Sequence, residues 1–348
     1  MLVIDDIYYH DVQMKVLITG VGGFLGSHIA EHLIKLNHDV YGVDNFIGGE
    51  YNNCSYLPLK KLYVEDCCDL NAMLIATKDI DVVYHCAATP HEGLSVFSPY
   101  VITKNNLLAS VSVITAAIQN KVKRIIYCSS MARYGRQDTP FTEDMKTKPQ
   151  DPYGISKVAG EEMLKTLCDT HNVEWVIAVP HNIIGPKQKY NDPYRNVVSI
   201  FLNRMMQNKP PIIYGDGKQT RCFSYVDDCI SSLIKMSQHT DVVNQIINIG
   251  PDEEFVTIKE VAELCANVTG FNKSFIHMQD RPQEVKHAVC SSNKARSMLQ
   301  YKTITSLKEG IQKTYEYIKR QGPKPFEYHL NLEIINNKTP ETWKNKLI

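Results

Sequence analysis

Four polar side chains in the middle of the chain have the types and the order of a proton-transfer site. Ser129 and Ser130 end an apolar segment at residues 124–128, and Tyr153 and Lys157 follow after Ser130. Side chains four residues apart on a helix share a face, so the lysine can support a tyrosinate that acts as a base. The spacing alone is not specific, because the same Tyr-x-x-x-Lys pattern also begins at Tyr56, Tyr100, Tyr214 and Tyr315.

A glycine-rich turn near the start of the chain supplies the context for this site. Gly20, Gly23 and Gly26 follow an apolar segment at residues 14–19 and precede a stretch expected to be helical. Glycine permits a tight turn and a close approach of backbone to pyrophosphate, and a helix N-terminus offers free N–H groups. A dinucleotide beside a tyrosinate base predicts a nicotinamide-dependent enzyme acting on a sugar carbinol; the alternative is an ordinary glycine turn.

The residues that end the next strands favour NAD over NADP. Asp44 ends the second expected strand after Gly26, where a carboxylate can bind a ribose diol and would repel a 2′-phosphate. Asp66 follows the third strand and either meets the adenine edge or caps its loop. Small residues at 86–88 would let the fourth strand end close against the cofactor.

Composition excludes several other classes of protein. The chain has 348 residues with 38 basic and 38 acidic side chains, so its charge does not indicate a nucleic acid or membrane partner. No apolar run approaches the roughly 18–20 residues of a membrane span, and acids follow Met1 where a signal peptide has bases, which predicts a cytoplasmic protein. Ten cysteines without a Cys-x-x-Cys pair are expected to be reduced. His28 and His32 lack the order of a zinc motif, and no metal is predicted.

Apolar strands alternate with helical stretches through the first half of the chain. Strands are expected at residues 14–19, 39–44, 61–65, 81–86, 124–128 and 174–179, and helices at about 24–36, 100–119 and 153–170. This alternation predicts an α/β fold, a Rossmann-type doubly wound parallel sheet with its ligands at the carboxyl ends of the strands. Longer loops and helices near 196–207, 227–237, 257–268 and 305–319 predict a smaller C-terminal substrate-binding lobe.

The expected organisation has four parts. An N-terminal extension at 1–13 precedes an NAD-binding domain at 14–180, a mainly substrate-binding lobe at 181–320 and a C-terminal tail at 321–348. Within the tail, apolar residues at 326, 328, 330, 332 and 334 alternate with polar ones. This period of two predicts a strand that adds to a sheet edge of its own subunit or of a neighbour.

Together these motifs resemble those of the extended short-chain dehydrogenases/reductases, and most closely their nucleotide-sugar epimerase branch. The resemblance covers about residues 14–320 and rests on the glycine turn, Asp44-Asn45, His85-Cys-Ala-Ala88, Ser129-Ser130, Tyr153 with Lys157, and Asn182-x-x-Gly185-Pro186. It implies NAD as the cofactor and a nucleotide-diphosphate sugar, such as a UDP-hexose, as the substrate. It also implies a homodimer paired through the helices at about 100–119 and 153–168.

The resemblance further implies a role for each polar residue. Tyr153 as a phenolate would take the proton of a sugar hydroxyl; its ordinary pKa is about 10, and Lys157 with a positively charged nicotinamide would lower it. Ser130 would hydrogen-bond the reacting oxygen, with Ser129 as the alternative. The hydride would pass to NAD, and the resulting 4-keto sugar would rotate and take it back on its other face.

The implied binding residues form two sets. The cofactor contacts are Gly20, Gly23, Phe24, Leu25, Gly26, Asp44, Asn45, Asp66, Cys67, Cys86, Ala87, Ala88, Asn106, Ser129, Tyr153, Lys157 and Pro180. The substrate contacts are Ser130, Asn182, Asn196, Arg221 and Arg281. The two arginines would hold the diphosphate, since the guanidinium fork suits phosphate oxygens.

Related activities need groups that this chain does not carry at the aligned positions. Sugar dehydratases, decarboxylases and epimerases that act beside a ketone resemble one another in using an acid or a thiol where Met131 and Ala132 stand here. Pro90 replaces a lysine common in the family, and Arg133 has no assigned role. A nucleotide-sugar 4-dehydrogenase or ketoreductase would use the same residues as an epimerase, whereas a non-catalytic NAD-binding scaffold would not need them.

Overall fold

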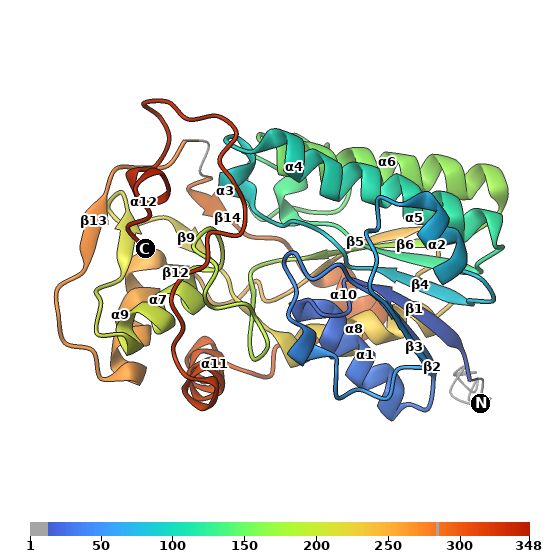
Figure 1. The fold of residues 1–348 in the computed structure, drawn as a ribbon, viewed down its shortest axis with the longest axis horizontal. Helices are drawn as coiled ribbons and strands as arrows, with labels where there is room; N and C mark the ends of the chain where they lie inside the picture. The colour runs from blue at the N-terminus through green and yellow to red at the C-terminus, as the bar shows by residue number, and fades with distance from the viewer. Residues whose placement is uncertain (1–12, 283–284) are drawn as a thin grey trace.

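A seven-stranded parallel sheet forms the centre of the computed structural model, which describes residues 13–282 and 285–348 (Figure 1). Its strands are β1 (Lys15–Thr19), β2 (Asp39–Val43), β3 (Lys61–Tyr63), β4 (Val82–His85), β5 (Arg124–Cys128), β6 (Glu174–Pro180) and β11 (Gln245–Ile249). The strand order is β11-β6-β5-β4-β1-β2-β3, so the order reverses between β1 and β4. This topology confirms the Rossmann-type fold, in which ligands bind outside the carboxyl ends at the switch point.

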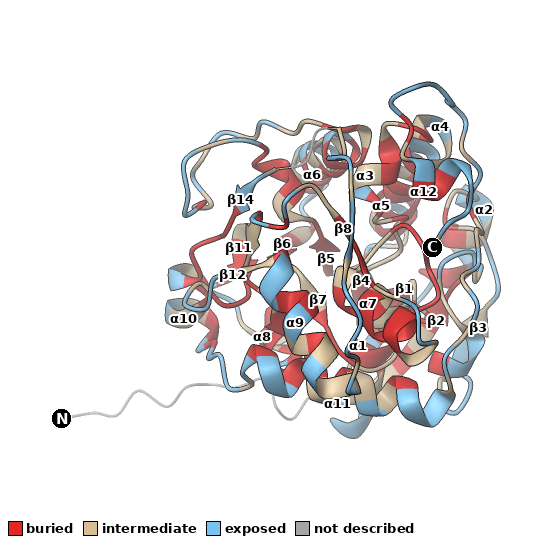
Figure 2. Cartoon of the chain, turned by 90° about the vertical axis from the view of Figure 1, so that its left-hand side faces the viewer, coloured by how far each residue is buried: buried red, intermediate tan, exposed pale blue. Residues whose placement is uncertain are grey.

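Helices bury both faces of this sheet, which explains the continuous apolar strands. On one face, Val16 and Ile18 of β1 pack in a core shared with α1 (Phe24–Lys35), α8 (Val226–Gln238) and α10 (Asn293–Leu299). On the other face, Leu17 packs in a core shared with α2 (Leu70–Ala76), α5 (Ala109–Gln119) and α6 (Pro152–His171). Figure 2 shows the sheet and the inward sides of these helices as buried.

The helix that precedes β5 has nearly the bounds expected from the sequence, but it is more apolar than expected. It runs through α4 (Pro99–Thr103), a widened π-helical turn η3 (Lys104–Leu108) and α5, a total of 21 residues. Its mean hydropathy of 1.4 and its length would suit a membrane span, contrary to the expectation that no such run exists. Half of the most apolar stretch of this helix is buried inside the protein, as expected for a helix that packs on a sheet.

A smaller lobe covers the carboxyl edge of the sheet. Its core joins α7 (Val197–Met206), α9 (Ile258–Thr269) and α11 (Leu307–Gln321). Short strands complete it: β7 (Ile183–Ile184) with β10 (Ser224–Tyr225), β8 (Ile212–Tyr214) with β13 (Ile276–Met278), and β9 (Thr220–Arg221) with β12 (Val256–Thr257) and β14 (His287–Ala288). The expected boundary at 180 does not separate the two parts, because α8, β11 and α10 return to the large sheet.

The strand expected in the C-terminal tail is not formed, since the structure has only irregular chain from 323 to 340 before a short helix, α12 (Glu341–Lys344). Three of the alternating apolar side chains, Tyr328, Leu330 and Leu332, pack instead against α3 (Glu92–Ser95) and the loop after it, in a cluster with Leu94, Phe97 and Trp343. The tail's backbone bonds to single groups there, such as Glu333 N–H to the Phe97 carbonyl (2.9 Å). The predicted N-terminal extension, apart from Gln13, lies outside the described residues.

Candidate active site

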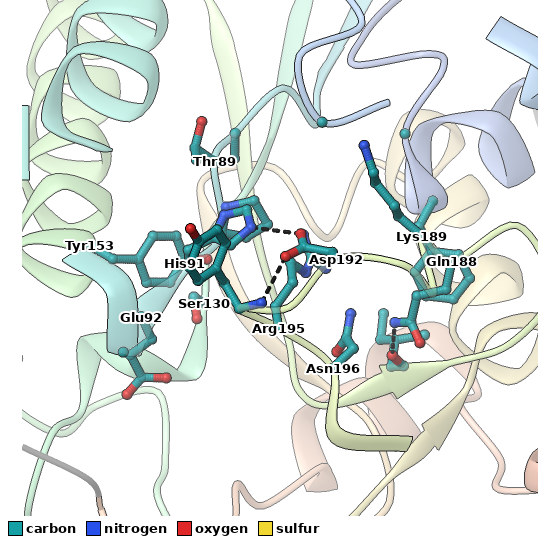
Figure 3. Close-up of a pocket in the computed structure, with 18 of the residues that line it drawn as sticks. Thr89, His91, Glu92, Ser130, Tyr153, Gln188, Lys189, Asp192, Arg195 and Asn196 are labelled. Carbon is teal, nitrogen blue, oxygen red and sulfur yellow. Dashed lines mark hydrogen bonds and ion pairs between the residues drawn. The ribbon is translucent and has the colours of Figure 1, made fainter. Parts of the chain in front are cut away.

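One cavity of about 520 Å³ lies between the sheet edge and the smaller lobe. It gathers most of the residues singled out in the sequence from segments far apart in the chain, and Figure 3 shows Ser130, Tyr153 and Asn196 among its lining side chains. The predicted residues that line it are Gly20, Gly23, Phe24, Leu25, Gly26, Asp44, Asn45, Asp66, Cys67, Cys86, Ala87, Ala88, Ser129, Ser130, Tyr153, Lys157, Pro180, Asn182, Asn196, Arg221 and Arg281. Asn106 is the one predicted binding residue that the structure does not place on this lining.

The glycine turn packs as a backbone cradle at the N-terminus of α1. Gly20 has a φ of +74°, a conformation that favours glycine, and its N–H donates to the Val43 carbonyl (2.7 Å). A Cβ on Gly26 would overlap the Gly20 carbonyl oxygen, and one on Gly20 would come within 2.8 Å of the Ala87 nitrogen. Backbone therefore approaches backbone where side chains would not fit, which is the geometry that a pyrophosphate at a helix N-terminus requires.

Asp44 closes the far side of this cradle. Its carboxylate accepts hydrogen bonds from the N–H groups of Gly22 (2.8 Å) and Phe46 (2.7 Å). Burial raises the pKa of Asp44, although these N–H groups act against the shift. Asp66 likewise accepts from the Cys68 N–H (2.8 Å), so it caps its own loop while still lining the cavity.

Tyr153 lies in the first turn of α6, which begins after Asp151. The Asp151 carboxylate accepts from the Gly154 N–H (2.9 Å), and Pro152 suits the first helical position. Burial raises the pKa of Tyr153 to about 12, while a hydrogen bond with Ser130 and the charge of Arg195 lower it. Burial also lowers the pKa of Lys157 to about 8, so this lysine is mostly protonated at pH 7.

The two serines at the end of β5 have different partners. Ser130 acts on Tyr153 by lowering the pKa of its phenol, and its hydroxyl oxygen accepts from the Ala132 N–H (3.2 Å). The Ser129 hydroxyl instead donates to the buried carboxylate of Glu161. Lys157 extends beneath this turn and donates to the Cys128 carbonyl (2.8 Å). Of the two serines, Ser130 is thus the one that interacts with Tyr153.

Asn106 acts behind the cavity. It lies in the π-helical turn, where its amide nitrogen donates to the Thr89 carbonyl (3.1 Å) and its oxygen accepts from the Thr89 N–H (3.1 Å). Its neighbour Asn105 lines the cavity and donates to the Thr89 hydroxyl (3.0 Å). Because a π turn shifts the register of side chains around a helix, sequence spacing did not reveal which asparagine faces the ligand.

The predicted substrate residues line the cavity from the smaller lobe. Asn182 donates to the Cys222 carbonyl (2.9 Å), and Asn196 precedes α7 with a φ of +63°. Arg221 donates to the Val285 carbonyl (2.7 Å), and Arg281 lies over the Tyr214 ring at 4.7 Å. Both arginines line the same cavity as the glycine cradle.

The lining also holds residues that were not predicted to bind a ligand, among them His91, Asp192, Arg195 and His329. The sequence carries no spacing signal that would group His91 with Asp192 or His329, which come from two other segments. In Figure 3 His91 lies between Tyr153 and Asp192. These side chains enlarge the polar lining next to the tyrosine.

Known proteins share this combination of fold and site. Residues 16–250, well over half of the chain, match the sequence profile of the NAD dependent epimerase/dehydratase family. The chain belongs to this family. The cavity of this epimerase/dehydratase family member fits NAD. It brings together the backbone donors of the glycine cradle, the carboxylate of Asp44 and the Tyr153–Lys157 pair.

Similar proteins include several nucleotide-sugar epimerases. A putative UDP-glucose 4-epimerase of Methanocaldococcus jannaschii is 33% identical, over 88% of this chain and 99% of the relative. The structure of a UDP-glucuronic acid 4-epimerase from Bacillus cereus with UDP-glucuronic acid and NAD has a TM-score of 0.82 at 30% identity, covering 89% of this chain and 100% of that one. A UDP-glucose 4-epimerase from Thermotoga maritima, solved with UDP-glucose, has a TM-score of 0.81 at 28% identity, covering 88% and 99%.

Proposed function

We propose that this family member is an NAD-dependent nucleotide-sugar epimerase that inverts C4 of a UDP-hexose. The observation that carries the proposal is that Tyr153 and Ser130 line the same cavity as the glycine cradle, Arg221 and Arg281. A nucleotide sugar held by Arg221 and Arg281 at its diphosphate would present its hexose to Tyr153. The similar proteins named above, which are UDP-sugar 4-epimerases, support this substrate class.

The residues of the chain divide the proton chemistry between them. Tyr153 takes the proton of the sugar 4-hydroxyl and later returns one to the 4-keto sugar. Lys157 stays mostly protonated at pH 7 and favours the tyrosinate by its positive charge. Ser130 hydrogen-bonds the reacting oxygen. NAD, when bound, supplies the acceptor and then the donor of the hydride.

The lining beside the serine supports epimerisation over elimination. Met131 and Ala132 border the cavity and carry no acid, base or thiol that could remove a second proton or expel water. A net dehydrogenase would share this lining, but it would release the reduced cofactor at every turnover. Retention of the cofactor is therefore the property that separates the two reactions.

Proton NMR of the purified protein with UDP-galactose and no added cofactor tests this proposal. We expect UDP-glucose to appear, and the Tyr153→Phe variant to slow the reaction by at least about a hundredfold while NAD stays bound. Stoichiometric NADH absorbance without UDP-glucose would instead identify a dehydrogenase. No conversion of UDP-galactose or any other nucleotide sugar would contradict the proposal.

The proposal includes a homodimer through α4–α5 and α6. Tyr100 and Leu108 on the first helix, and Ile155 and Met163 on the second, are 76%, 49%, 53% and 45% exposed. Ile155 and Met163 are eight residues apart on α6, so they share a helix face, and Figure 1 shows the two helices along one side of the sheet. Sedimentation with Leu108→Glu, expected to give a monomer, tests the dimer.

A cytoplasmic location is also proposed, supported by ten free cysteines.

A further inference from the structure

Two histidines and an aspartate from three distant segments meet in the wall of the cavity. His91 follows β4, Asp192 precedes α7, and His329 comes from the C-terminal tail; their ligand atoms lie within 4.8 Å of one another. Their side chains are 2%, 3% and 7% exposed. The His91 and His329 rings are 5.7 Å apart. The tail therefore reaches the cavity and contributes a polar side chain to it.

His91 has an unused acceptor. Its Nε2 is 2.8 Å from Asp192 Oδ2. Burial opposes ionisation of Asp192, but the interaction with His91 and the guanidinium of Arg195 lower its pKa to about 2, so the group is a carboxylate at neutral pH. Burial lowers the pKa of His91, so the ring is neutral, and the proton must be on Nε2 because a carboxylate can only accept. Nδ1 is then a buried lone pair with no hydrogen-bond partner.

His329 presents a second acceptor of the same kind. Its Nδ1 is 3.3 Å from the Glu327 carbonyl, which can only accept, so the proton of a neutral ring belongs on Nδ1. Its Nε2 is 3.9 Å from Asp192 Oδ2, beyond hydrogen-bond range, and has no hydrogen-bond partner. A buried polar atom without a partner is costly, so two in one cavity wall indicate a site completed by a ligand.

The chemistry of these atoms selects the kind of group that binds. Two lone pairs need donors, which hydroxyl groups supply and a carboxylate or phosphate at neutral pH does not. A divalent metal would also accept lone pairs, but the guanidinium of Arg195, which interacts electrostatically with Asp192, would repel a second positive centre. Sugar hydroxyls fit both conditions.

We propose that His91 Nδ1 and His329 Nε2 accept hydrogen bonds from hydroxyl groups of the hexose, so that the C-terminal tail supplies a specificity-determining residue of the substrate pocket. The inference rests on the proposed function and adds the part of the pocket that recognises the sugar. The tail is anchored for this role: the Tyr194 hydroxyl donates to the Leu330 carbonyl (2.9 Å), and the Ser98 hydroxyl to the Asn331 carbonyl (2.8 Å).

Calorimetric titration of NAD-saturated protein with UDP and with UDP-glucose tests the proposal. His329→Phe keeps an aromatic ring beside Tyr194 and His91 but removes the acceptor. We expect it to weaken UDP-glucose binding about tenfold, the effect of one lost hydrogen bond, and to leave UDP binding unchanged. His329→Gln, which restores an acceptor, should recover part of the loss. His171→Phe, at an exposed position outside the cavity, is the matched control.

Each other outcome overturns the inference. Equal losses for UDP and UDP-glucose would mean that His329 only supports the fold of the pocket, and no loss for either would mean that it touches no substrate. Stoichiometric uptake of Zn²⁺ that His329→Phe abolishes would make the cluster a metal site instead. If the wild-type protein bound neither UDP nor UDP-glucose, the proposed function itself would be wrong and this inference would fall with it.

Discussion

Arg133 and Glu161 form a buried ion pair directly beneath the serine turn of the candidate active site. Arg133 Nη2 is 3.0 Å from Glu161 Oε2, and the two side chains are 3% and 0% exposed. The Glu161 carboxylate also accepts from the Ser129 hydroxyl and lies one turn after Lys157 on α6. Arg133, which had no role in the sequence analysis, thus ties the end of β5 to the helix that carries the base.

The first prediction concerns this ion pair. Arg133→Met leaves the Glu161 charge buried without its partner, so the free energy of unfolding should fall by about 3–5 kcal/mol. Urea denaturation followed by circular dichroism measures the change. The double variant Arg133→Met/Glu161→Gln removes both charges and should recover most of the loss. A single variant as stable as the wild type would show that the pair contributes little.

The glycine cradle gives a second prediction. A Cβ at Gly26 would overlap the Gly20 carbonyl oxygen, which is backbone and cannot swing away. Gly26→Ala should therefore displace the turn, weaken NAD binding by more than about tenfold and destabilise the protein by about 1–3 kcal/mol.

Gly48→Ala provides the matched control, because nothing lies within 4 Å of the Cβ it would add. Fluorescence titration with NADH and thermal denaturation compare the two variants. Similar NADH affinities for Gly26→Ala and Gly48→Ala would contradict the role given to the cradle.

The third prediction is a change in cofactor preference. Asp44→Asn keeps an oxygen that can accept from the Gly22 or Phe46 N–H but removes the negative charge that opposes a 2′-phosphate. The ratio of NADP to NAD dissociation constants should fall at least about tenfold, since a hydrogen bond to a charged group contributes about 1.5–3 kcal/mol. Parallel titrations with the two nucleotides measure this ratio, and an unchanged ratio would remove Asp44 from the ribose site.

The fourth prediction concerns pH and His28. Burial lowers the pKa of His28 from 6.5 to about 4, while its Nε2 lies 3.0 Å from the Pro186 carbonyl. As the pH falls below 6.5, His28 becomes protonated in the unfolded chain but stays neutral in the folded protein until about pH 4. The free energy of unfolding therefore decreases over this pH window.

His28→Gln can keep the hydrogen bond to Pro186 but does not titrate. Between pH 7.5 and pH 5, the wild type should therefore lose about 2 kcal/mol more stability than this variant. Other buried histidines, such as His85 and His181, titrate in both proteins and cancel in the comparison. Parallel pH profiles of the two proteins would contradict the shift assigned to His28.

Signals that reside in a few consecutive residues were readable from the sequence. The spacing of Gly20, Gly23 and Gly26 reflects a turn that only glycine can make, and Tyr153 and Lys157 share a helix face because they are one turn apart. The strands were visible because burial on both faces makes each of them apolar throughout. These features depend on the local geometry of short segments, so they can be predicted from residue type and spacing.

Other features depended on which surfaces meet in space. The alternating residues of the tail predicted a strand, but Leu330 finds an apolar cluster around Phe97 instead of a sheet edge. Asn106 faces away from the cavity because a π turn rotates the helix there. Local patterns also did not predict that β11 joins the large sheet. In sequence β11 lies among segments of the smaller lobe, but in the structure it pairs with β6.

The sequence by itself determined the doubly wound sheet, the glycine cradle and the Ser130, Tyr153 and Lys157 set, because periodicity and short spacing encode each of them. Only the tertiary structure decided that Arg133 pairs with Glu161 and that His91, Asp192 and His329 meet in the cavity wall. The physical reason is chain path. Residues on different elements become neighbours only when packing brings those elements together, and local spacing in the sequence does not indicate such contacts.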